Sequence, residues 1–194
     1  GISQSGQEVT AAVAKEMTKG LSSVGKMAAS IGTDVIPIDI GINTREVIPG
    51  LLPRSVRKGT RNFRKEPAMT PEEAWQAIHT GISLVAEYKE KGYQILATGE
   101  MGIGNTTTSS AVIASLLKCE AVTGRGAGLS DAGLIRKQQV IREAIEKYHL
   151  YEAEPFEVLR TVGGLDIAGL AGVCIGGAVH HVPIVLDGVI SFAA

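Results

Sequence analysis

Hydrophobic and polar residues alternate along the chain with two periods, one typical of helices and the other of strands. Apolar positions spaced three and four residues apart predict helices in segments 8–30, 70–91, 111–117, 130–147, 155–160 and 165–179. Short apolar runs predict buried strands in segments 34–40, 93–97 and 182–186. Gly20 and Gly25 divide the first helical segment in two, and a last helix should begin after residue 186. Strands that alternate with helices favour an α/β fold with a parallel sheet and helices on both faces, a Rossmann-like three-layer sandwich.

The clearest helix start is Thr70-Pro71-Glu72-Glu73. Threonine is a suitable cap, proline is tolerated at the first helical position, and acidic residues are favourable in the first turn. This helix should run to about Lys91, where Gly92 ends it. Four of its apolar residues fall at helical spacing and should face the sheet: Trp75, Ile78, Ile82 and Val85.

Segment 41–70 is an unusually long connection. It holds three of the seven prolines, and loops of this length are usually functional or mobile. We interpret its basic cluster first as a solvated loop, and second as an arm that faces a phosphate or a partner. The cluster consists of Arg54, Arg57, Lys58, Arg61, Arg64 and Lys65.

The composition indicates one globular domain over residues 1–194. The chain is 44% hydrophobic and 20% charged, and its 24 glycines exceed the usual share of about 7%, which favours many tight turns. The formal charge of −1 and the 4% aromatic content argue against nucleic acid or an anionic membrane as a partner. No apolar run has the 18 residues that a membrane span needs. Cys119 and Cys174 lack metal-site spacing and fit a reducing cytoplasm, so we expect no metal.

The central motif lies between a predicted strand and a predicted helix. Gly102 and Gly104 allow a tight turn and a close approach of the backbone to a ligand. Asn105 and the hydroxyls from Thr106 onward can cap the helix and leave its first N–H groups facing outward, an arrangement that binds phosphate. Glu100 is the exception, because a carboxylate beside a phosphate is repelled unless it acts on another part of the ligand. The motif reads Thr98-Gly99-Glu100-Met101-Gly102-Ile103-Gly104-Asn105-Thr106-Thr107-Thr108-Ser109-Ser110.

The same motif is compatible with a purely structural turn. Glycine-rich turns between a strand and a helix often serve only to close the loop, and both the G-x-G-x-x-G and the G-x-x-x-x-G-K-[ST] patterns are absent here. Spacing alone therefore leaves an anion site and a structural turn equally supported.

Other polar groups follow predicted strands, where ligands of parallel α/β folds bind. Glu100 follows one strand and Asp187 another, and residues 124–128 form a second glycine loop. Lys137 lies near the start of the next helix, from which it could reach an anion, although a lysine on an amphipathic helix is more often solvated. Asp166 and Asp187 each precede small residues that open a helix, so we interpret both first as caps or turn formers.

Gly99-Glu100-Met101-Gly102-Ile103-Gly104-Asn105-Thr106-Thr107 resembles the signature of the nicotinate-nucleotide:dimethylbenzimidazole phosphoribosyltransferase family, which makes the lower-ligand nucleotide of cobalamin. The resemblance extends along the whole chain in the family's order. Its further segments are Gln7-Glu8-Val9-Thr10, Val35-Ile36-Pro37-Ile38-Asp39-Ile40-Gly41, Val122-Thr123-Gly124-Arg125-Gly126-Ala127-Gly128, Lys137, Val162-Gly163-Gly164-Leu165-Asp166-Ile167-Ala168-Gly169 and Pro183-Ile184-Val185-Leu186-Asp187-Gly188.

The resemblance implies transfer of the 5-phosphoribosyl group from nicotinate mononucleotide to a benzimidazole nitrogen, with inversion at the anomeric carbon. It places Glu100 as an active-site carboxylate near the nucleotide and Lys137 as a lysine that helps to bind or stabilise the ribotide. A fixed negative charge suits the oxocarbenium-like transition state of such a transfer. No metal or cofactor is needed. The substrate-binding residues that it implies are Gly102, Gly104, Asn105, Thr106, Thr107, Gly124, Arg125 and Gly126.

The chain departs from the family pattern in two respects. The family's main catalytic base is a glutamate far beyond Asp187-Gly188, so we expect it beyond Ala194, and the absence of the usual residues before Gly1 makes the chain look cut. We therefore expect the large α/β domain of a cytoplasmic, homodimeric enzyme, without the terminal parts that form its small domain. Val13 lies near a position where family members that prefer dimethylbenzimidazole can carry glutamine, so a phenolic or purine-like acceptor is conceivable.

Three functions stay open on the sequence. The first is a phosphoribosyltransferase core, and the second is a non-catalytic module that kept the nucleotide cradle and lost the base. Both predict binding of nicotinate mononucleotide, but only the first predicts turnover. A nicotinamide-dependent dehydrogenase ranks last because the dinucleotide fingerprint is absent.

Overall fold

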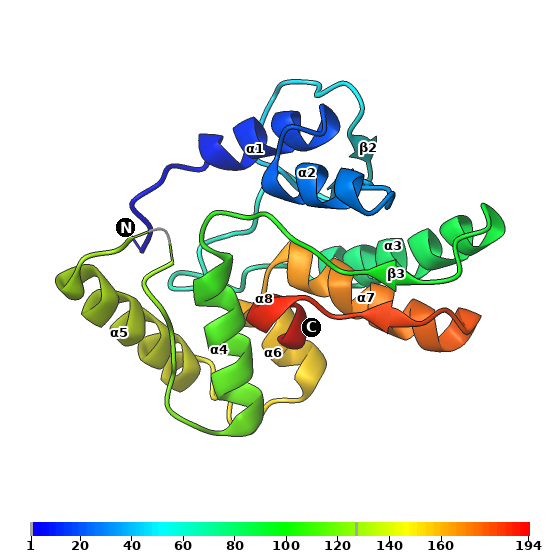
Figure 1. The fold of residues 1–194 in the computed structure, drawn as a ribbon. Helices are drawn as coiled ribbons and strands as arrows, with labels where there is room; N and C mark the ends of the chain where they lie inside the picture. Colours follow the sequence, from blue (N-terminus) through cyan, green and yellow to red (C-terminus); the bar gives the residue numbers. More distant parts are fainter. Residues whose placement is uncertain (1, 127) are drawn as a thin grey trace.

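The computed structural model describes residues 2–126 and 128–194, in which helices surround two short pairs of parallel strands (Figure 1). The helices are α1 (Glu8–Thr18), α2 (Ser23–Ser30), α3 (Pro71–Glu90), α4 (Asn105–Leu117), α5 (Asp131–Lys147), α6 (Pro155–Val162), α7 (Leu165–His180) and α8 (Gly188–Phe192). The strands are β1 (Ile38–Asp39), β2 (Leu52–Pro53), β3 (Leu96–Ala97) and β4 (Ile184–Val185). Gly1 and Ala127, on which two of the sequence predictions fall, lie outside the described residues. No helix among the described residues is both long and apolar enough to cross a membrane.

The predicted α/β fold with parallel strands is confirmed. β1 pairs with β2 in the register Ile38 to Leu52, and β3 pairs with β4 in the register Leu96 to Ile184. The strands are shorter than predicted, but the first pairing continues through backbone bonds from Val56 N–H to Ile40 O and from Gly59 N–H to Gly41 O. β2 was not predicted, because it lies inside the segment 41–70 that we expected to be a loop.

Helices α3 and α7 form the closest helix pair of the fold and run side by side in Figure 1. Glycines allow this contact: a Cβ at Gly81 would lie 2.1 Å from Gly169 O, and one at Gly172 would lie 2.0 Å from Ile78 O. The helix pair therefore excludes any side chain at these two glycines.

The prediction that α3 packs its apolar face on a sheet is wrong. Ile78 is buried in the helical core, and the buried Val85 lies against α7, where a Cβ at Gly176 would be 3.0 Å from it. Trp75 is 51% exposed and stacks on Phe156 of α6, with the ring centroids 4.7 Å apart. A large aromatic residue near the start of a helix can satisfy its helical spacing and still lie at the edge of the core, which spacing alone does not distinguish.

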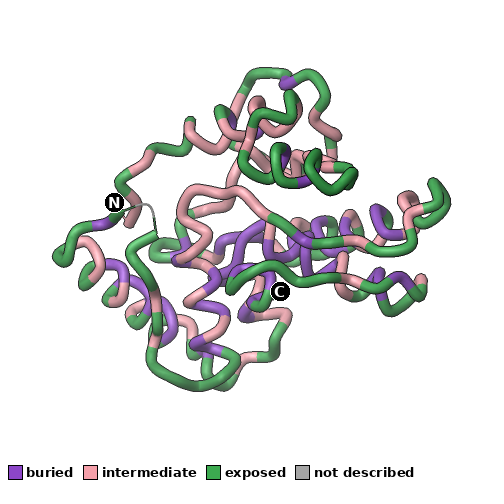
Figure 2. The backbone as a smooth tube through the Cα atoms, viewed as in Figure 1, coloured by how far each residue is buried: buried purple, intermediate pink, exposed green. Residues whose placement is uncertain are grey.

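The main core lies among the helices and joins buried residues of α3, α4, α5, α6 and α7 (Figure 2). A separate small cluster holds Ala11 and Ala14 of α1 against Ile48. The blue helices α1 and α2 are largely exposed or half-buried and lie together beside β2 in Figure 1. The turn between β3 and α4 lies between these two parts of the fold.

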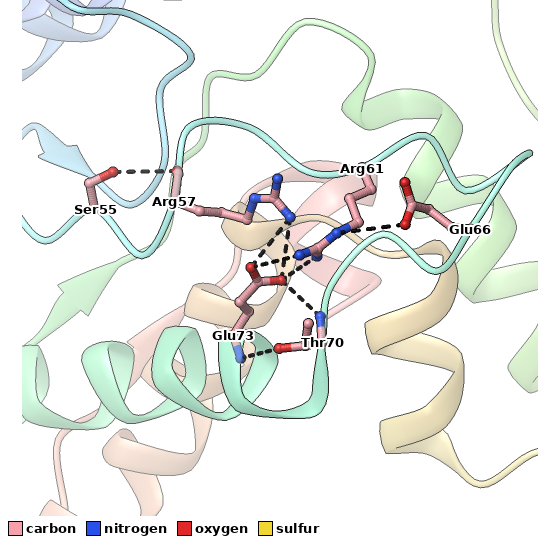
Figure 3. Close-up of polar contacts among 6 residues, drawn as sticks. All are labelled: Ser55, Arg57, Arg61, Glu66, Thr70 and Glu73. Atoms are coloured by element: carbon pink, nitrogen blue, oxygen red, sulfur yellow. Dashed lines mark hydrogen bonds and ion pairs between the residues drawn. The ribbon is translucent and has the colours of Figure 1, made fainter.

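The basic cluster of segment 41–70 is solvated only in part: Lys58 and Lys65 are exposed, whereas its arginines pair with acidic residues of α3 and α5. Arg57 and Arg61 both contact the Glu73 carboxylate, and the Arg61 Nη1 atom lies 2.5 Å from Glu73 Oε2 (Figure 3). Glu73 also accepts from the Thr70 N–H at 2.8 Å, while the Thr70 hydroxyl accepts from the Glu73 N–H, so the predicted helix start is a complete capping box. Arg54 pairs with Glu87, and Arg64 with Glu143. The ion pairs of these four arginines connect segment 41–70 to α3 and α5.

Candidate functional site

The glycine-rich motif folds into the predicted order of strand, turn and helix, but the helix begins at Asn105 and not at the predicted residue 111. β3 ends at Ala97, and α4 begins at Asn105 with Gly104 as the preceding cap residue. Gly104 has φ +100°, a conformation that favours glycine. The turn is also attached to α1, because the Ile103 N–H donates to Thr10 Oγ1 at 3.2 Å. Thr10 belongs to the segment 7–10 of the resemblance, but no sequence pattern assigned it this contact.

The predicted capping of α4 by Asn105 and the hydroxyls is wrong. No side chain caps the helix start. Ser109 and Ser110 instead donate back to the carbonyls of Asn105 and Thr106, each at 2.7 Å, which is the alternative that short hydroxyl side chains offer within helices. Two N–H groups of the first turn are also engaged, that of Asn105 with Gly102 O and that of Thr107 with Gly104 O.

Glu100, Asn105 and Asp166 form a contiguous polar group at the start of α4. The Asn105 Nδ2 amide donates to Glu100 Oε2 and also to Asp166 Oδ2, the latter at 3.1 Å. Asp166 comes from the first turn of α7, where it does not act as the side-chain cap that we expected. Two carboxylates from distant parts of the chain therefore share one amide donor.

The surroundings of this group disfavour negative charge. Burial raises the pKa of Glu100, the hydrogen bond from Asn105 opposes that rise, and the charges of Asp166 and Asp187 reinforce it. Burial likewise raises the pKa of Asp166, against the hydrogen bonds from Asn105 and from the Ile167 N–H. A positively charged ligand group would relieve both carboxylates.

Asp187 acts on Glu100 through its negative charge, and its side chain does not cap α8. It occupies the residue before α8, but its side chain makes no capping bond. Its N–H donates to the buried Thr98 Oγ1 at 3.1 Å, and Thr98 Oγ1 in turn donates to Ser191 Oγ at 2.9 Å. The end of β3 and the start of α8 are thereby held together beside Glu100.

Lys137 forms a second polar group at the α4 start, together with Thr106 and the second glycine loop. It is only 1% exposed, and its Nζ donates to Thr106 Oγ1 at 2.7 Å and to Gly124 O at 3.0 Å. Burial lowers the pKa of this ammonium. The predicted alternative of a solvated helix lysine is therefore wrong. Gly126 is also close, since a Cβ there would lie 3.3 Å from Thr106 Oγ1.

Arg125 is turned away from both groups. Its guanidinium donates to Leu129 O at 3.0 Å and pairs with Asp131 at the start of α5. Thr107 is fully buried, and its hydroxyl oxygen has no hydrogen-bond partner within the described part of the chain. Of the predicted binding residues, those at the start of α4 and in the second glycine loop come together, whereas Arg125 has other partners.

The arrangement is bipolar. Asn105 contacts the two carboxylates, and the next residue, Thr106, accepts from the buried Lys137 ammonium, so charges of both signs adjoin the start of α4. A ligand with a cationic end and an anionic end would meet an opposite charge at each. Across residues 2–126 and 128–194, no three His, Cys, Asp or Glu side chains converge in the way that a metal site requires.

Comparison with known proteins gives a match along the whole chain. A family model described as phosphoribosyltransferase matches residues 1–194. The chain is 47% identical over 196 residues to an Acetivibrio thermocellus protein named nicotinate-nucleotide--dimethylbenzimidazole phosphoribosyltransferase, covering 100% of this chain and 56% of that protein. A Clostridium perfringens protein of the same name is 43% identical over 196 residues, covering 100% of this chain and 54% of the relative.

A solved structure is similar as well. The crystal structure of CobT from Thermus thermophilus superposes with a TM-score of 0.92 at 38% identity, covering 99% of this chain and 58% of that one. The chain thus spans about half the length of the relatives that it matches.

Proposed function

Since this chain belongs to the phosphoribosyltransferase family, we propose that it takes part in moving the 5-phosphoribosyl group of nicotinate mononucleotide to 5,6-dimethylbenzimidazole or a related base. The products are nicotinate and α-ribazole 5′-phosphate, in cobalamin nucleotide-loop assembly. The names of the relatives support this substrate pair, and the family resemblance stated from the sequence is confirmed by the same match.

The observation that carries the proposal is the bipolar start of α4. Nicotinate mononucleotide has a positively charged pyridinium nitrogen attached to C1′ of the ribose and a phosphate at C5′. Glu100 and Asp166 suit the cationic end, and Lys137 suits the phosphate. The Lys137 ammonium donates hydrogen bonds to Thr106 Oγ1 and Gly124 O. A phosphate oxygen can replace either of these acceptors.

The chemistry needs no group other than the two substrates and a base. The bond from C1′ to the pyridinium nitrogen breaks, and its electron pair leaves with nicotinate. A benzimidazole nitrogen forms the new bond to C1′ from the opposite face, which inverts the anomeric carbon. Positive charge develops at C1′ in the transition state, where the fixed carboxylate of Glu100 stabilises it. The acceptor's second nitrogen loses its proton to the base, a glutamate that we place beyond Ala194.

The remaining site residues serve binding in this proposal. Gly102 and Gly104 bring the backbone close to the ribosyl group, and Thr106 holds Lys137 near the phosphate. Thr107 is fully buried, so it supports the start of α4 and does not face the ligand. Gly124 and Gly126 close over the phosphate from the second glycine loop, with Arg125 exchanging Asp131 for the ligand. Asn105 contributes by holding Glu100.

We also propose a homodimer in the cytoplasm. Apolar side chains exposed on α2 and at its C-cap, namely Val24, Met27 and Ile31, are suited to burial against another surface. Cys119 and Cys174 are both unpaired, as expected in a reducing compartment.

The alternative is a nucleotide-binding module without turnover. Such a module would need only the contacts at the start of α4, where the buried Lys137 donates to Thr106. In that case the cradle binds nicotinate mononucleotide, and the base that completes the transfer belongs to another polypeptide segment.

The test is to incubate the chain with nicotinate mononucleotide and dimethylbenzimidazole and to separate nicotinate and α-ribazole phosphate by chromatography. Product that disappears with Glu100→Ala and with Lys137→Ala supports the transferase. Absence of product, together with nucleotide binding that Lys137→Ala weakens, supports the binding module. Absence of both product and binding contradicts the proposal.

A further inference from the structure

We propose that Asp166 is a positioning residue that orients Glu100 through the side-chain amide of Asn105. Glu100 follows β3 on an irregular turn, which does not fix a side chain by itself. Its hydrogen-bond donor is the Asn105 Nδ2 group, and the same Nδ2 lies 3.1 Å from Asp166 Oδ2. With carboxylates on both sides, the amide can present only its NH₂ group to them. Asp166 thereby sets the amide orientation, and the amide sets the Glu100 carboxylate.

Asp166 is well anchored for this task. It lies in the first turn of α7, the helix that packs most closely on α3. Its other oxygen, Oδ1, accepts from the Ile167 N–H at 3.0 Å. The start of a helix also favours a negative charge. The Asp166 carboxylate is therefore the fixed end of the chain of contacts, and Glu100 is the end that faces a ligand.

Two glycines leave the space that this arrangement needs. A Cβ at Gly164 would lie 2.3 Å from Asp166 Oδ1, and one at Gly102 would lie 3.1 Å from Asp166 Oδ2 and 3.4 Å from Asn105 Nδ2. The backbone at Gly102 and the backbone at Gly164 thus both lie close to the Asp166 carboxylate. This packing is a structural reason for glycine at position 102, in addition to the proposed contact of Gly102 with the ribosyl group.

Two charges act on Glu100, and both are negative. Asp166 faces it from α7 and Asp187 from the residue before α8, and both raise the pKa of Glu100, whereas the Asn105 hydrogen bond from α4 lowers it. No ion pair reaches Glu100 or Asp166 among the residues that the structure describes. Asp166 therefore acts on Glu100 in two opposite ways, by its charge and by its hold on Asn105.

The role of Glu100 in transfer rests on the proposed function, but the positioning itself is measurable without substrate. The carboxyl carbon of Glu100 can be followed by carbon-13 NMR against pH, with Glu100→Gln to assign its signal. Asp166→Asn removes the charge but keeps an oxygen that accepts from Asn105, so the pKa of Glu100 should fall. Asn105→Ala removes the donor, so that pKa should rise.

The Asp166→Ala variant distinguishes the positioning role of Asp166 from the effect of its charge on Glu100. It also removes the acceptor, so the pKa of Glu100 should be higher in Asp166→Ala than in Asp166→Asn. In the Asn105→Ala background the two Asp166 variants should give the same Glu100 titration, because no amide is left to orient. Equal titrations of Asp166→Ala and Asp166→Asn in the parent chain would overturn the proposal. So would a difference between them that persists without Asn105.

Two controls make the result specific. Asp131→Asn changes an exposed carboxylate in the first turn of α5 and should leave the Glu100 titration unchanged. Circular dichroism identifies variants that fold, and Asn105→Ser replaces Asn105→Ala if the latter does not. The titration can succeed when the transfer assay gives no product, so failure of the proposed function and failure of the positioning role are distinguishable.

Discussion

The Lys137 ammonium lies 2.7 Å from Thr106 Oγ1 in a position where the lysine side chain is only 1% exposed. A buried lysine with neutral acceptors is costly, since its charge has left water without meeting a carboxylate. Such a residue is commonly found where function requires it. Its neighbours, the start of α4 and the second glycine loop, are the segments that we propose to hold a phosphate.

Lys137→Met should weaken binding of nicotinate mononucleotide at least about tenfold, because one charge-assisted hydrogen bond is worth ~1.5–3 kcal/mol. The fold should persist. The lowered pKa of Lys137 means that the folded state binds fewer protons, so the parent chain should gain stability relative to Lys137→Met as pH rises. Calorimetric titration and urea unfolding at several pH values measure both effects. Lys58→Met, at an exposed position, is the control and should change neither.

Glu100→Gln should stabilise the chain at neutral pH. The pKa of Glu100 is raised, so the folded state binds more protons than the unfolded state, and the parent chain loses stability as pH rises above the ordinary carboxyl range. The melting temperature should rise by a few degrees, the effect of ~1 kcal/mol in a chain of this size.

The gain from Glu100→Gln should vanish toward pH about 4, where the unfolded carboxyl is itself protonated. Glu152→Gln, at an exposed residue, should show no such pH-dependent gain. A gain that is independent of pH would contradict the electrostatic explanation.

Glu73→Gln should destabilise the chain by about 1–3 kcal/mol at neutral pH, as expected for hydrogen bonds to charged groups. Burial alone would raise the pKa of Glu73, but the bonds from Arg61 and Thr70 and the charges of Arg57 and Arg61 hold it below its usual value. The stability that the Glu73 carboxylate contributes is therefore present above the pKa of Glu73 in the unfolded state. It is lost as the pH falls through the pKa of Glu73 in the folded state. Urea unfolding measures it. Glu66→Gln, whose carboxylate lies 3.9 Å from Arg61 and is largely exposed, should cost much less.

Gly172→Ala should destabilise the chain by more than about 3 kcal/mol, or prevent folding, because overpacking against backbone cannot be relieved by rotamer changes. The added methyl group would lie 2.0 Å from Ile78 O. Thermal unfolding monitored by circular dichroism tests this. Ser83→Ala, at an exposed position of α3, should be neutral or slightly stabilising because alanine favours helices. Similar melting temperatures for both variants would show that the α3–α7 contact is looser than described.

Local signals predicted the elements well. The helix start with Thr70 as its cap is confirmed, and the glycine-rich turn between β3 and α4 lies within the predicted motif. Both depend on neighbours within a few residues, and these are readable from sequence. β2 was missed because Leu52 and Pro53 carry no strand pattern of their own, and only pairing with β1 defines them.

Long-range relationships were predicted poorly. The basic cluster pairs with Glu73, Glu87 and Glu143, and no local pattern identifies partners so distant. The contact between Asp166 and Asn105 joins residues 61 positions apart, so sequence spacing suggested only a cap for Asp166. Lys137 was placed in the site by family resemblance, whereas its helical context favoured a solvated side chain.

The most direct test of the account is calorimetric titration of the chain and of Lys137→Met with nicotinate mononucleotide. We predict that the parent chain binds the nucleotide and that the variant binds at least about tenfold more weakly while it keeps its fold. Equal affinity of the two proteins would contradict a phosphate site at the start of α4. No binding by the parent chain would contradict the proposed function as a whole.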